Sequence, residues 1–441
     1  MKKPIPIIIF LTAAALLLSG CGINANYRSI ERLLTVEALG LDAAAGGVVL
    51  SAATGSAGGA PLLLRRGGDS LLSAMEQLQD YADAGQLFFA HTRFLVLGED
   101  YARAGLAPLL DYVERDMHLR TGVLLAVVRE QEASALLTAE RSGDAASALT
   151  AAERDAETRG DSRFTGVREL ARDLAEDGAA LVCALELRPA EGSVFPEGEG
   201  LAVVPAGYAV VRGAALAGYL TGDTARCASL LLGHPGQQRR TVEAAGGRYV
   251  LELDAAETKL APVYAGGAGE LRGAGGAEDE LTLCGTDGAL AGLELRVTLR
   301  FAVAERLEPM TAASDTDAAE ELCAALEAEI GQEIAAVLAA SREYDADFLR
   351  LGRALRKHGA ELVPAERDGG DGGTGAQERN AGDGVPYGAA ETFGEGVGDG
   401  LRTSRGPGCF TLQTLPVRVT LRAVLDRGGD ISAPVGTGGT T

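Results

Sequence analysis

The stretch LFFAHTRFLVLGEDYARAGLAPLLDYVERDMHLRTGVLLAVVRE, residues 87–130, predicts a strand, then a helix, then a second strand. Residues 87–97 are mostly apolar and are expected to form the first strand. Residues 103–113 place leucine and valine on one helical face, and Pro108 must then lie in the first turn. Residues 123–128 are a continuous apolar run, expected as the second strand. This alternation indicates a sheet with helices packed on it.

Elements of the same kinds are expected on both sides of this stretch. Two apolar runs separated by Gly46-Gly47 predict a β-hairpin, and Asp69 is expected to cap the helix that follows it. Residues 140–163, rich in alanine and charged side chains, are interpreted as a solvated helix or loop. The other expected positions are strands at 33–41, 48–53 and 180–187, and helices at 71–78, 133–139 and 166–175.

The later sequence predicts a second group of elements. A hairpin is expected over residues 201–220, followed by a helix that begins near Thr221 and ends at Gly233. The strand expected at 410–425 must return to a sheet built earlier in the chain. The apolar stripe of a long helix at 315–340 is formed by Leu322, Leu326, Ile330, Ile334 and Val337. The remaining elements are strands at 249–253, 281–284 and 293–303, and a helix at 346–357.

The expected fold class is α+β, with several domains in which mixed β-sheets are flanked by helices. Residues 189–200 contain prolines, glycines and acids and are interpreted as a linker. Residues 364–408 contain fourteen glycines and eight acids, so we expect a disordered insertion. The expected domains are an N-terminal α/β domain at 21–195 and a C-terminal α+β domain at 201–435, with two possible subdomains at 201–262 and 263–435.

The first residues predict export and lipidation. Two lysines precede an apolar run at 5–18, which is too short to span a bilayer, and Leu18-Ser19-Gly20-Cys21 follows. This tetrapeptide matches the bacterial lipobox, in which the cysteine thiol receives a diacylglycerol and becomes the mature N-terminus. Residues 1–20 are therefore expected to be a lipoprotein signal peptide, and Cys21 the attachment site of acyl chains such as palmitate.

Composition argues against several classes of partner and site. The formal net charge is −22, which disfavours nucleic acid and also a polybasic docking surface for anionic headgroups. Without Cys21, five cysteines remain, and their odd number and wide spacing indicate neither a disulfide framework nor a zinc site. These cysteines are Cys183, Cys227, Cys284, Cys323 and Cys409.

No pattern of reactive side chains is present in the sequence. The spacings of zinc-dependent proteases, serine hydrolases and phosphate-binding loops are all missing. His91 is expected in the middle of the strand at 87–97, as a hydrogen-bonded structural histidine. We therefore expect no catalytic residue, no metal site and no cofactor.

Several segments together resemble one family, the spore-germination lipoproteins written Ger(x)C. Three segments resemble the family: residues 87–130, GYAVVRGAALAGYLTGDTARCASLLLG at 207–233, and EYDADFLRLGRALRK at 343–357. A final strand at 417–424, followed by Gly428, also fits. The matching positions are His91, Gly98, Glu99, Gly105, Leu106, Arg115, Asp116 and Arg120, then Gly207, Val210, Leu216, Gly218, Leu220, Ala225 and Gly233, and last Asp347, Gly352 and Leu355.

The resemblance implies a peripheral subunit of a nutrient germinant receptor. Such receptors also contain two integral membrane subunits, of A and B type, and lie in the spore's inner membrane with this lipoprotein on its outer face. The resemblance implies no catalytic residues. The chain departs from the family in having Gly22 where a tryptophan usually follows the lipidated cysteine, in having no tryptophan at all, and in the length of 364–408.

Two other functions compete with this interpretation. A solute-binding lipoprotein of an importer also has a lipobox, but it needs two doubly wound lobes joined by crossover strands. The hairpin at 201–220 and the late returning strand argue against that architecture. A tethered hydrolase would need a nucleophile and a base, for which no arrangement appears.

Overall fold

The structure, a computed structural model, divides into two compact units, Met1–Leu230 with His234–Gln238, and Leu231–Gly233 with Arg239–Thr441. The signal peptide predicted at 1–20, Cys21, Cys284 and the insertion expected at 364–408 lie outside the described residues. The described residues are 33–55, 62–80, 86–115, 119–139, 145–189, 201–244, 246–264, 290–307, 315–363 and 409–427.

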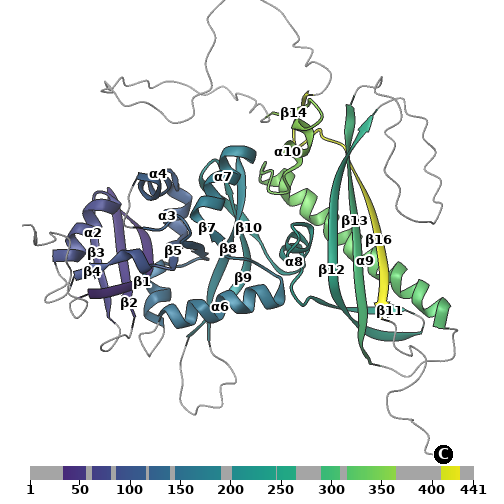
Figure 1. The fold of residues 1–441 in the computed structure, drawn as a ribbon, viewed down its shortest axis with the longest axis horizontal. Coiled ribbons are helices and arrows are strands. Elements are labelled where there is room, and N and C mark those ends of the chain that lie inside the picture. Colours follow the sequence, from purple (N-terminus) through teal and green to yellow (C-terminus); the bar gives the residue numbers. More distant parts are fainter. Residues whose placement is uncertain are drawn as a thin grey trace, which may run out of the picture. The chain divides into compact units, whose positions relative to one another are not determined.

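The first unit is built on a ten-stranded mixed sheet with the order β10-β9-β8-β6-β5-β1-β2-β3 (Figure 1). Strands β1, β5, β6 and β8 run parallel, so their carboxyl ends meet at one edge of the sheet. Short strands β4 and β7 pair with β1 and β6. The bounds are β1 Leu33–Ala44, β2 Gly47–Thr54, β3 Leu63–Gly68, β4 Gln86–Phe88, β5 Phe94–Gly98, β6 Leu124–Val128, β7 Thr165–Gly166, β8 Ala179–Pro189, β9 Leu201–Arg212 and β10 Ala215–Leu220.

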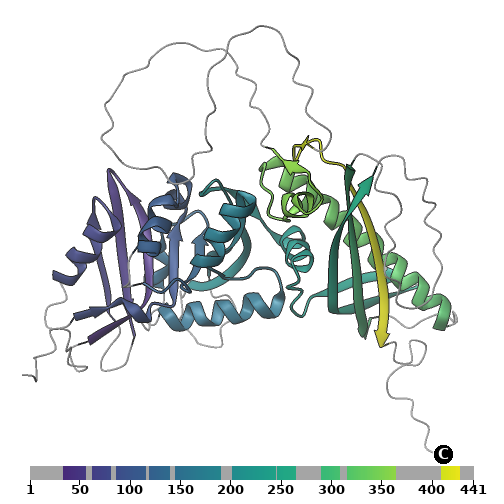
Figure 2. The same ribbon diagram turned by 45° about the horizontal axis from the view of Figure 1, so that its top comes forward.

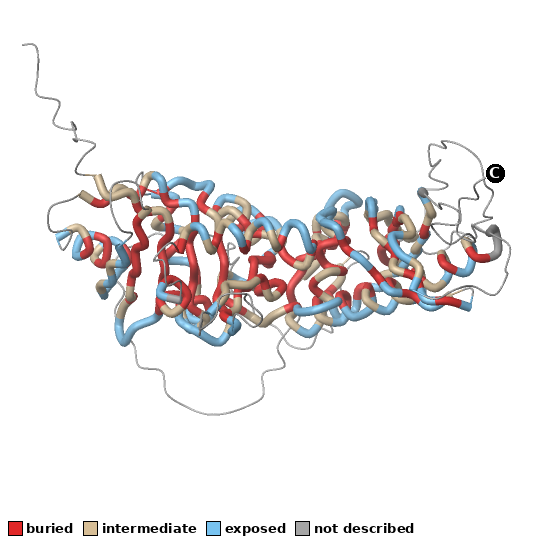
Figure 3. The backbone as a smooth tube through the Cα atoms, turned by 90° about the horizontal axis from the view of Figure 1, so that it is seen from below, coloured by how far each residue is buried: buried red, intermediate tan, exposed pale blue. Residues whose placement is uncertain are grey.

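Helices cover both faces of this sheet, which explains why its central strands are apolar without alternation. Along β1, Leu39 and Leu41 pack with α2, α3, α4 and α7, whereas Ala38 faces α5 and α6. Figure 3 shows the central strands buried along most of their length. The bounds are α2 Leu71–Asp80, α3 Glu99–Ala104, α4 Ala107–Arg115, α5 Ala133–Ala139, α6 Ala145–Arg159, α7 Val167–Asp177 and α8 Gly222–Leu231.

The second unit contains a four-stranded sheet, β11-β12-β13-β16, and one long helix, α9 (Figure 2). All five residues of the predicted apolar stripe of α9 are fully buried. Strand β16 returns to pair in parallel with β13, which confirms the predicted return of the late strand. The bounds are β11 Arg239–Ala244, β12 Gly247–Tyr264, β13 Leu290–Arg306, α9 Asp315–Glu343, α10 Leu351–Arg356, β14 Glu361–Leu362, β15 Cys409–Phe410 and β16 Val417–Arg427.

The strand predicted at 87–97 is interrupted. β4 ends at Phe88, a 3-10 turn spans Phe89–His91, and β5 begins at Phe94. His91 is exposed, with its ring centroid 5.3 Å from that of Phe88, so the prediction of a structural histidine within a strand was wrong. The break faces an irregularity in the partner strand, since β1 changes register between Val36 and Ala38.

The predicted helix at 103–113 is two helices, because the backbone of Gly105 has a φ of 126° that ends α3. Pro108 lies in the first turn of α4, as predicted. The segment 140–163 contains the helix α6, which buries its alanine and leucine face. The helix expected at 346–357 is shorter, since α10 spans Leu351–Arg356. At the start of α2, the Ser70 hydroxyl, and not Asp69, accepts a hydrogen bond from the Ser73 N–H at 3.2 Å.

The compact units divide at a different place from the expected domains. The hairpin of β9 and β10, which we placed in the C-terminal domain, pairs with β8 and so completes the first sheet. The expected subdomain boundary at residues 262 and 263 falls within one sheet, because β12 pairs with β13 along nearly its whole length. Main-chain pairing between consecutive strands across the intervening segments, which linker composition does not reveal, decides both points. The α+β class with mixed sheets and flanking helices is confirmed.

Candidate functional site

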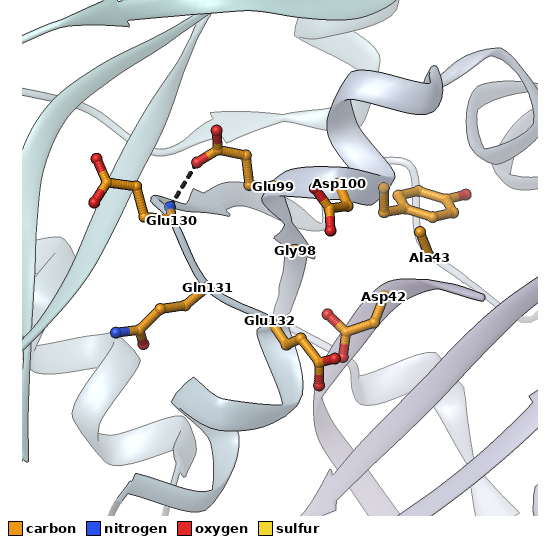
Figure 4. A pocket seen from close by; sticks show the side chains of 9 residues that line it. Asp42, Ala43, Gly98, Glu99, Asp100, Glu130, Gln131 and Glu132 are labelled. Carbon is orange, nitrogen blue, oxygen red and sulfur yellow. Dashed lines mark hydrogen bonds between the residues drawn. The ribbon is translucent and has the colours of Figure 1, made fainter. Parts of the chain in front are cut away.

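An acidic pocket of about 270 Å³ lies at the carboxyl ends of β1, β5 and β6. Ligand sites in parallel sheets usually lie at this edge, which makes the pocket the candidate site. Figure 4 shows carboxylates from three separate segments around it. The lining residues are Asp42, Ala43, Gly98, Glu99, Asp100, Tyr101, Glu130, Gln131 and Glu132.

Asp42 forms the floor of the pocket and is only 2% exposed. Its carboxylate accepts hydrogen bonds from the N–H groups of Ala133, at 2.6 Å, and Ser134, at 3.0 Å. These groups belong to the first turn of α5, whose N–H groups have no partner within the helix. A side chain from β1 therefore caps a helix that lies 91 residues later in the sequence.

Gly98 is required next to that carboxylate. A Cβ atom at this position would lie 2.4 Å from Asp42 Oδ1 and 3.2 Å from the backbone nitrogen of Ala133. Since real Cβ atoms do not approach oxygen so closely, any larger residue would displace the capping carboxylate. Close packing against Asp42 and α5 therefore explains why a glycine occupies position 98, one of the positions that match the family.

Glu99, the next residue, is the most connected side chain of the pocket. Its Oε1 accepts from Arg103 Nη2 at 2.6 Å, and its Oε2 accepts from the backbone N–H of Glu130 at 2.5 Å. The Tyr219 hydroxyl donates to the same Oε2 at 2.9 Å. Glu130 has a φ of 57°, in the left-handed region, so an unusual backbone conformation presents its N–H to Glu99.

These contacts set the charge state of Glu99. Partial burial alone would raise the pKa of its carboxyl group, but the hydrogen bonds from Glu130, Arg103 and Tyr219 outweigh it and lower the pKa below 4.5. Burial, together with the hydrogen bond to Glu99, raises the pKa of Tyr219. The pair is therefore a carboxylate and a neutral phenol at neutral pH, neither of which is tuned to exchange protons there.

Tyr219 brings a second part of the sequence to the pocket. It lies on β10, and the guanidinium of Arg129 lies 5.7 Å from its ring centroid. The contact pair Glu99 and Tyr219 joins the end of β5 to a hairpin that begins after residue 200. A residue of a strand far along the chain therefore fixes one oxygen of Glu99 at the pocket.

A larger and mainly apolar hollow of about 880 Å³ adjoins the acidic pocket in the same unit. Ala43 and Tyr101 line both hollows and form their shared boundary. The larger hollow lies between the β1–β2 turn and helices α2, α3 and α4, and Leu72 at its rim is 52% exposed.

Gly207 and Asp347, two other positions that match the family, also have structural roles. A Cβ at Gly207, whose φ is 94°, would lie 2.1 Å from the carbonyl oxygen of Leu220 and 3.1 Å from the Ala225 side chain. Asp347 accepts hydrogen bonds from the N–H groups of Leu351, at 2.8 Å, and Gly352, at 2.6 Å, and so caps α10. These residues fix turns and helix ends.

The structure brings only some of the predicted positions together. Gly98 and Glu99 lie in the pocket, whereas His91 and Arg120 are exposed outside it and Arg115 pairs with Asp111 on α4. Cys21 and Asp116 lie outside the described residues. The sequence interpretation missed Asp42, Glu130 and Tyr219. A polar residue directly after an apolar strand was the available signal for Asp42, and none existed for Tyr219.

Within the described ranges no group of three histidine, cysteine, aspartate or glutamate side chains is arranged to hold a metal ion. None of the helices that the structure describes is both long enough and apolar enough to cross a membrane. What the pocket offers is an ionised carboxylate surrounded by fixed donors, an arrangement that organises the ends of β1, β5, β6 and β10.

Comparison with known proteins identifies the family of the chain. Residues 26–187 match the family model of the spore germination protein N-terminal domain, and residues 206–368 match the spore germination B3/GerAC-like C-terminal domain. The chain belongs to the GerAC-like spore germination proteins. All residues that line the acidic pocket lie in the N-terminal match, whereas Tyr219, which donates a hydrogen bond to Glu99, lies in the C-terminal match of this germination protein.

Among solved structures, the crystal structure of the GerBC protein is similar to this chain, with 14% sequence identity and a TM-score of 0.43. The similarity covers 73% of this chain and 87% of that chain. No curated protein matches the chain significantly.

Proposed function

We propose that this germination protein is a lipid-anchored, non-enzymatic subunit of a nutrient germinant receptor. The observation that carries the proposal is the ordered match of both GerAC-like regions, which together span residues 26–368 apart from a short gap. The partners in this proposal are the two integral membrane subunits of A and B type. Their shared location is the spore inner membrane, with this chain on its outer face.

The lipobox supports the anchor. Leu18-Ser19-Gly20-Cys21 would place a diacylglycerol on Cys21, and each buried methylene contributes about 0.8 kcal/mol to membrane binding. One acyl chain gives only marginal binding, whereas two or three retain a protein on the membrane. An anchor of this kind would keep the folded units beside the membrane subunits at high local concentration.

The contacts of the acidic pocket support a role without catalysis. Asp42 caps α5, and both oxygens of Glu99 accept hydrogen bonds from fixed donors. A general acid or base needs a pKa near the working pH, whereas the pKa of Glu99 is lowered and that of Tyr219 is raised. We infer that the site holds strand ends together so that the surface offered to the membrane subunits keeps one shape.

The architecture disfavours the alternative, a solute-binding lipoprotein of an importer. Such a protein needs two doubly wound lobes, and the second unit is instead a four-stranded sheet with one long helix. Neighbouring genes give an inexpensive check. Genes for multi-spanning germination subunits agree with the receptor, whereas a permease with an ATPase agrees with the importer.

The decisive experiment combines a pull-down from spore membranes with a germination assay in a deletion strain. The tagged chain should co-purify with the integral membrane subunits, and its loss should abolish germination by at least one nutrient. Normal germination with every nutrient, in a strain that lacks all other receptors, would refute the proposal. So would turnover of a peptide or peptidoglycan substrate that a single side-chain substitution abolishes.

A further inference from the structure

The sheet of the second unit has one face toward α9 and one face away from it. On β11, the Arg240 side chain reaches Glu333 of α9 at 3.0 Å, and Arg240 is paired with Leu251 of β12. Side chains alternate along strands, so the buried Leu253, Leu295 and Leu299 also lie on the α9 side. The residues between them point to the outer face.

Basic side chains gather on this outer face. The register places Arg296 of β13 opposite Lys259 of β12 on one side and Thr420 of β16 on the other. Along β16, Arg418 is opposite Glu294, and Arg422 is opposite Thr298. Arg296 therefore lies diagonally between Arg418 and Arg422 of the neighbouring strand. We name this set the arginine face: Lys259, Arg296, Arg300, Arg418 and Arg422.

The acids on the same part of the sheet are too few to neutralise it. Glu294 accepts from Arg296 at 2.6 Å, and Glu257 contacts Lys259 at 2.7 Å. Over 255–261 of β12, 294–300 of β13 and 418–424 of β16, five basic residues and two acids give a local charge of +3, on a chain whose formal net charge is −22. Beyond this area Glu252 pairs with Arg239, and Asp254 is exposed beside Ala255. Arg300, Arg418 and Arg422 are exposed, and none of them has an ion-pair partner within 4.0 Å among the described residues.

An unneutralised group of like charges destabilises a sheet surface unless something anionic compensates it. Arginine suits a phosphate particularly well, because its planar guanidinium presents several donors in a fixed fork. The face is formed by neighbouring extended strands, so it can approach a broad surface with several arginines at once. The acids elsewhere on the chain repel such a surface, which leaves this face as the favoured approach.

We propose that the arginine face binds the anionic headgroup surface of a phospholipid membrane. Each basic residue near such a surface contributes about 1 kcal/mol, roughly a fivefold gain in partitioning. The net charge of the whole chain disfavours a polybasic docking surface, but the pairing of β12, β13 and β16 gathers basic side chains on one local face. Headgroup binding is separate from the anchor at Cys21, and in a tethered chain it would fix which face of the second unit lies against the bilayer.

The test uses the chain from residue 22 onward, which contains every described residue and no lipid attachment site. It is sedimented with vesicles of phosphatidylglycerol mixed with phosphatidylcholine, and with vesicles of phosphatidylcholine alone, at low and at high salt. The variant is Arg300→Glu with Arg422→Glu. The matched control is Arg154→Glu with Arg168→Glu, which reverses two exposed arginines of the first unit.

The unmodified chain and the control should bind the anionic vesicles, release them at high salt, and ignore the neutral ones. The Arg300→Glu and Arg422→Glu variant should lose binding by at least about tenfold while its melting temperature stays unchanged. Equal binding to neutral vesicles, or equal loss in the control, would overturn the proposal. So would an unmodified chain that ignores anionic vesicles but needs the two arginines to co-purify with the membrane subunits, since the face would then be a protein interface.

Discussion

Tyr219 donates a hydrogen bond to Glu99 Oε2 at 2.9 Å, and the two residues are 120 positions apart in the chain. Glu99 follows β5, in the N-terminal region of the family, and Tyr219 lies on β10, in the C-terminal region. The compact first unit extends beyond the first family match because β9 pairs with β8, and this bond is a side-chain contact between the two regions. The two family regions share one sheet and are joined by side chains at its edge.

Replacing Tyr219 with phenylalanine should weaken this junction without creating a cavity. The loss of one hydrogen bond to a charged group is expected to lower the free energy of unfolding by about 1.5–3 kcal/mol. Urea unfolding followed by circular dichroism measures it. Tyr264→Phe on β12 is the control, and an equal loss in that variant would mean that the Glu99 contact contributes nothing specific.

Glu99 should make stability depend on pH in a defined direction. The pKa of its carboxyl group is lower in the folded chain than the ordinary 4.5, so its contribution is fully present above 4.5 and is lost as pH falls toward the folded value. The destabilisation caused by Glu99→Gln should therefore be largest near neutral pH and shrink in acid. Unfolding midpoints across that range, with the exposed Glu114→Gln as control, give the curve. A pH-independent difference would contradict the assignment.

Gly98→Ala should be costly although alanine is small. Its Cβ would lie 2.4 Å from Asp42 Oδ1, so the carboxylate must move and α5 loses its cap. Overpacking and loss of a cap together predict about 2 kcal/mol or more of destabilisation. The control is Gly122→Ala, where nothing lies within 4 Å of the added atom, and its effect should stay within about 0.5 kcal/mol. Similar melting temperatures for the two variants would refute this account of Gly98.

In the second unit, Arg240→Met should be strongly destabilising. The side chain of Arg240 is 2% exposed and pairs with Glu333, which is 9% exposed, so the substitution leaves a buried carboxylate without its cation. The expected loss is about 3–5 kcal/mol, and adding Glu333→Leu should recover much of it. Arg239→Met removes only a surface pair with Glu252 and should cost less than about 1 kcal/mol. A double variant less stable than Arg240→Met would show that the pair is not the cause.

Cys21→Ala should separate folding from membrane attachment. The thiol is the predicted acylation site, so the variant should stay folded, appear in the soluble fraction, and fail to restore germination to a deletion strain. Washed membranes from cells that lack the A and B subunits provide the assay. Retention of the variant on those membranes would refute a purely lipid anchor.

Local patterns in the sequence were sufficient for many elements. The hairpin of β1 and β2, the buried stripe of α9 and the β9–β10 hairpin follow from apolar periodicity and turn residues, which act over a few positions. The predictions that were wrong also have physical causes. The break at Phe89–His91 depends on how β4 and β5 pair with the distant strand β1, and the division between the units depends on the pairing of β9 with β8.

By itself, the sequence predicted a leader and determined most element types and the family, because hydropathy, turn chemistry and ordered segments are encoded locally. Only the tertiary structure decided that Asp42 caps α5, that Tyr219 reaches Glu99, and that arginines of β13 and β16 share one face. Each of these relationships needs a particular strand order and register. A shift of one residue would turn every side chain of a strand to the opposite face, so no local pattern can specify them.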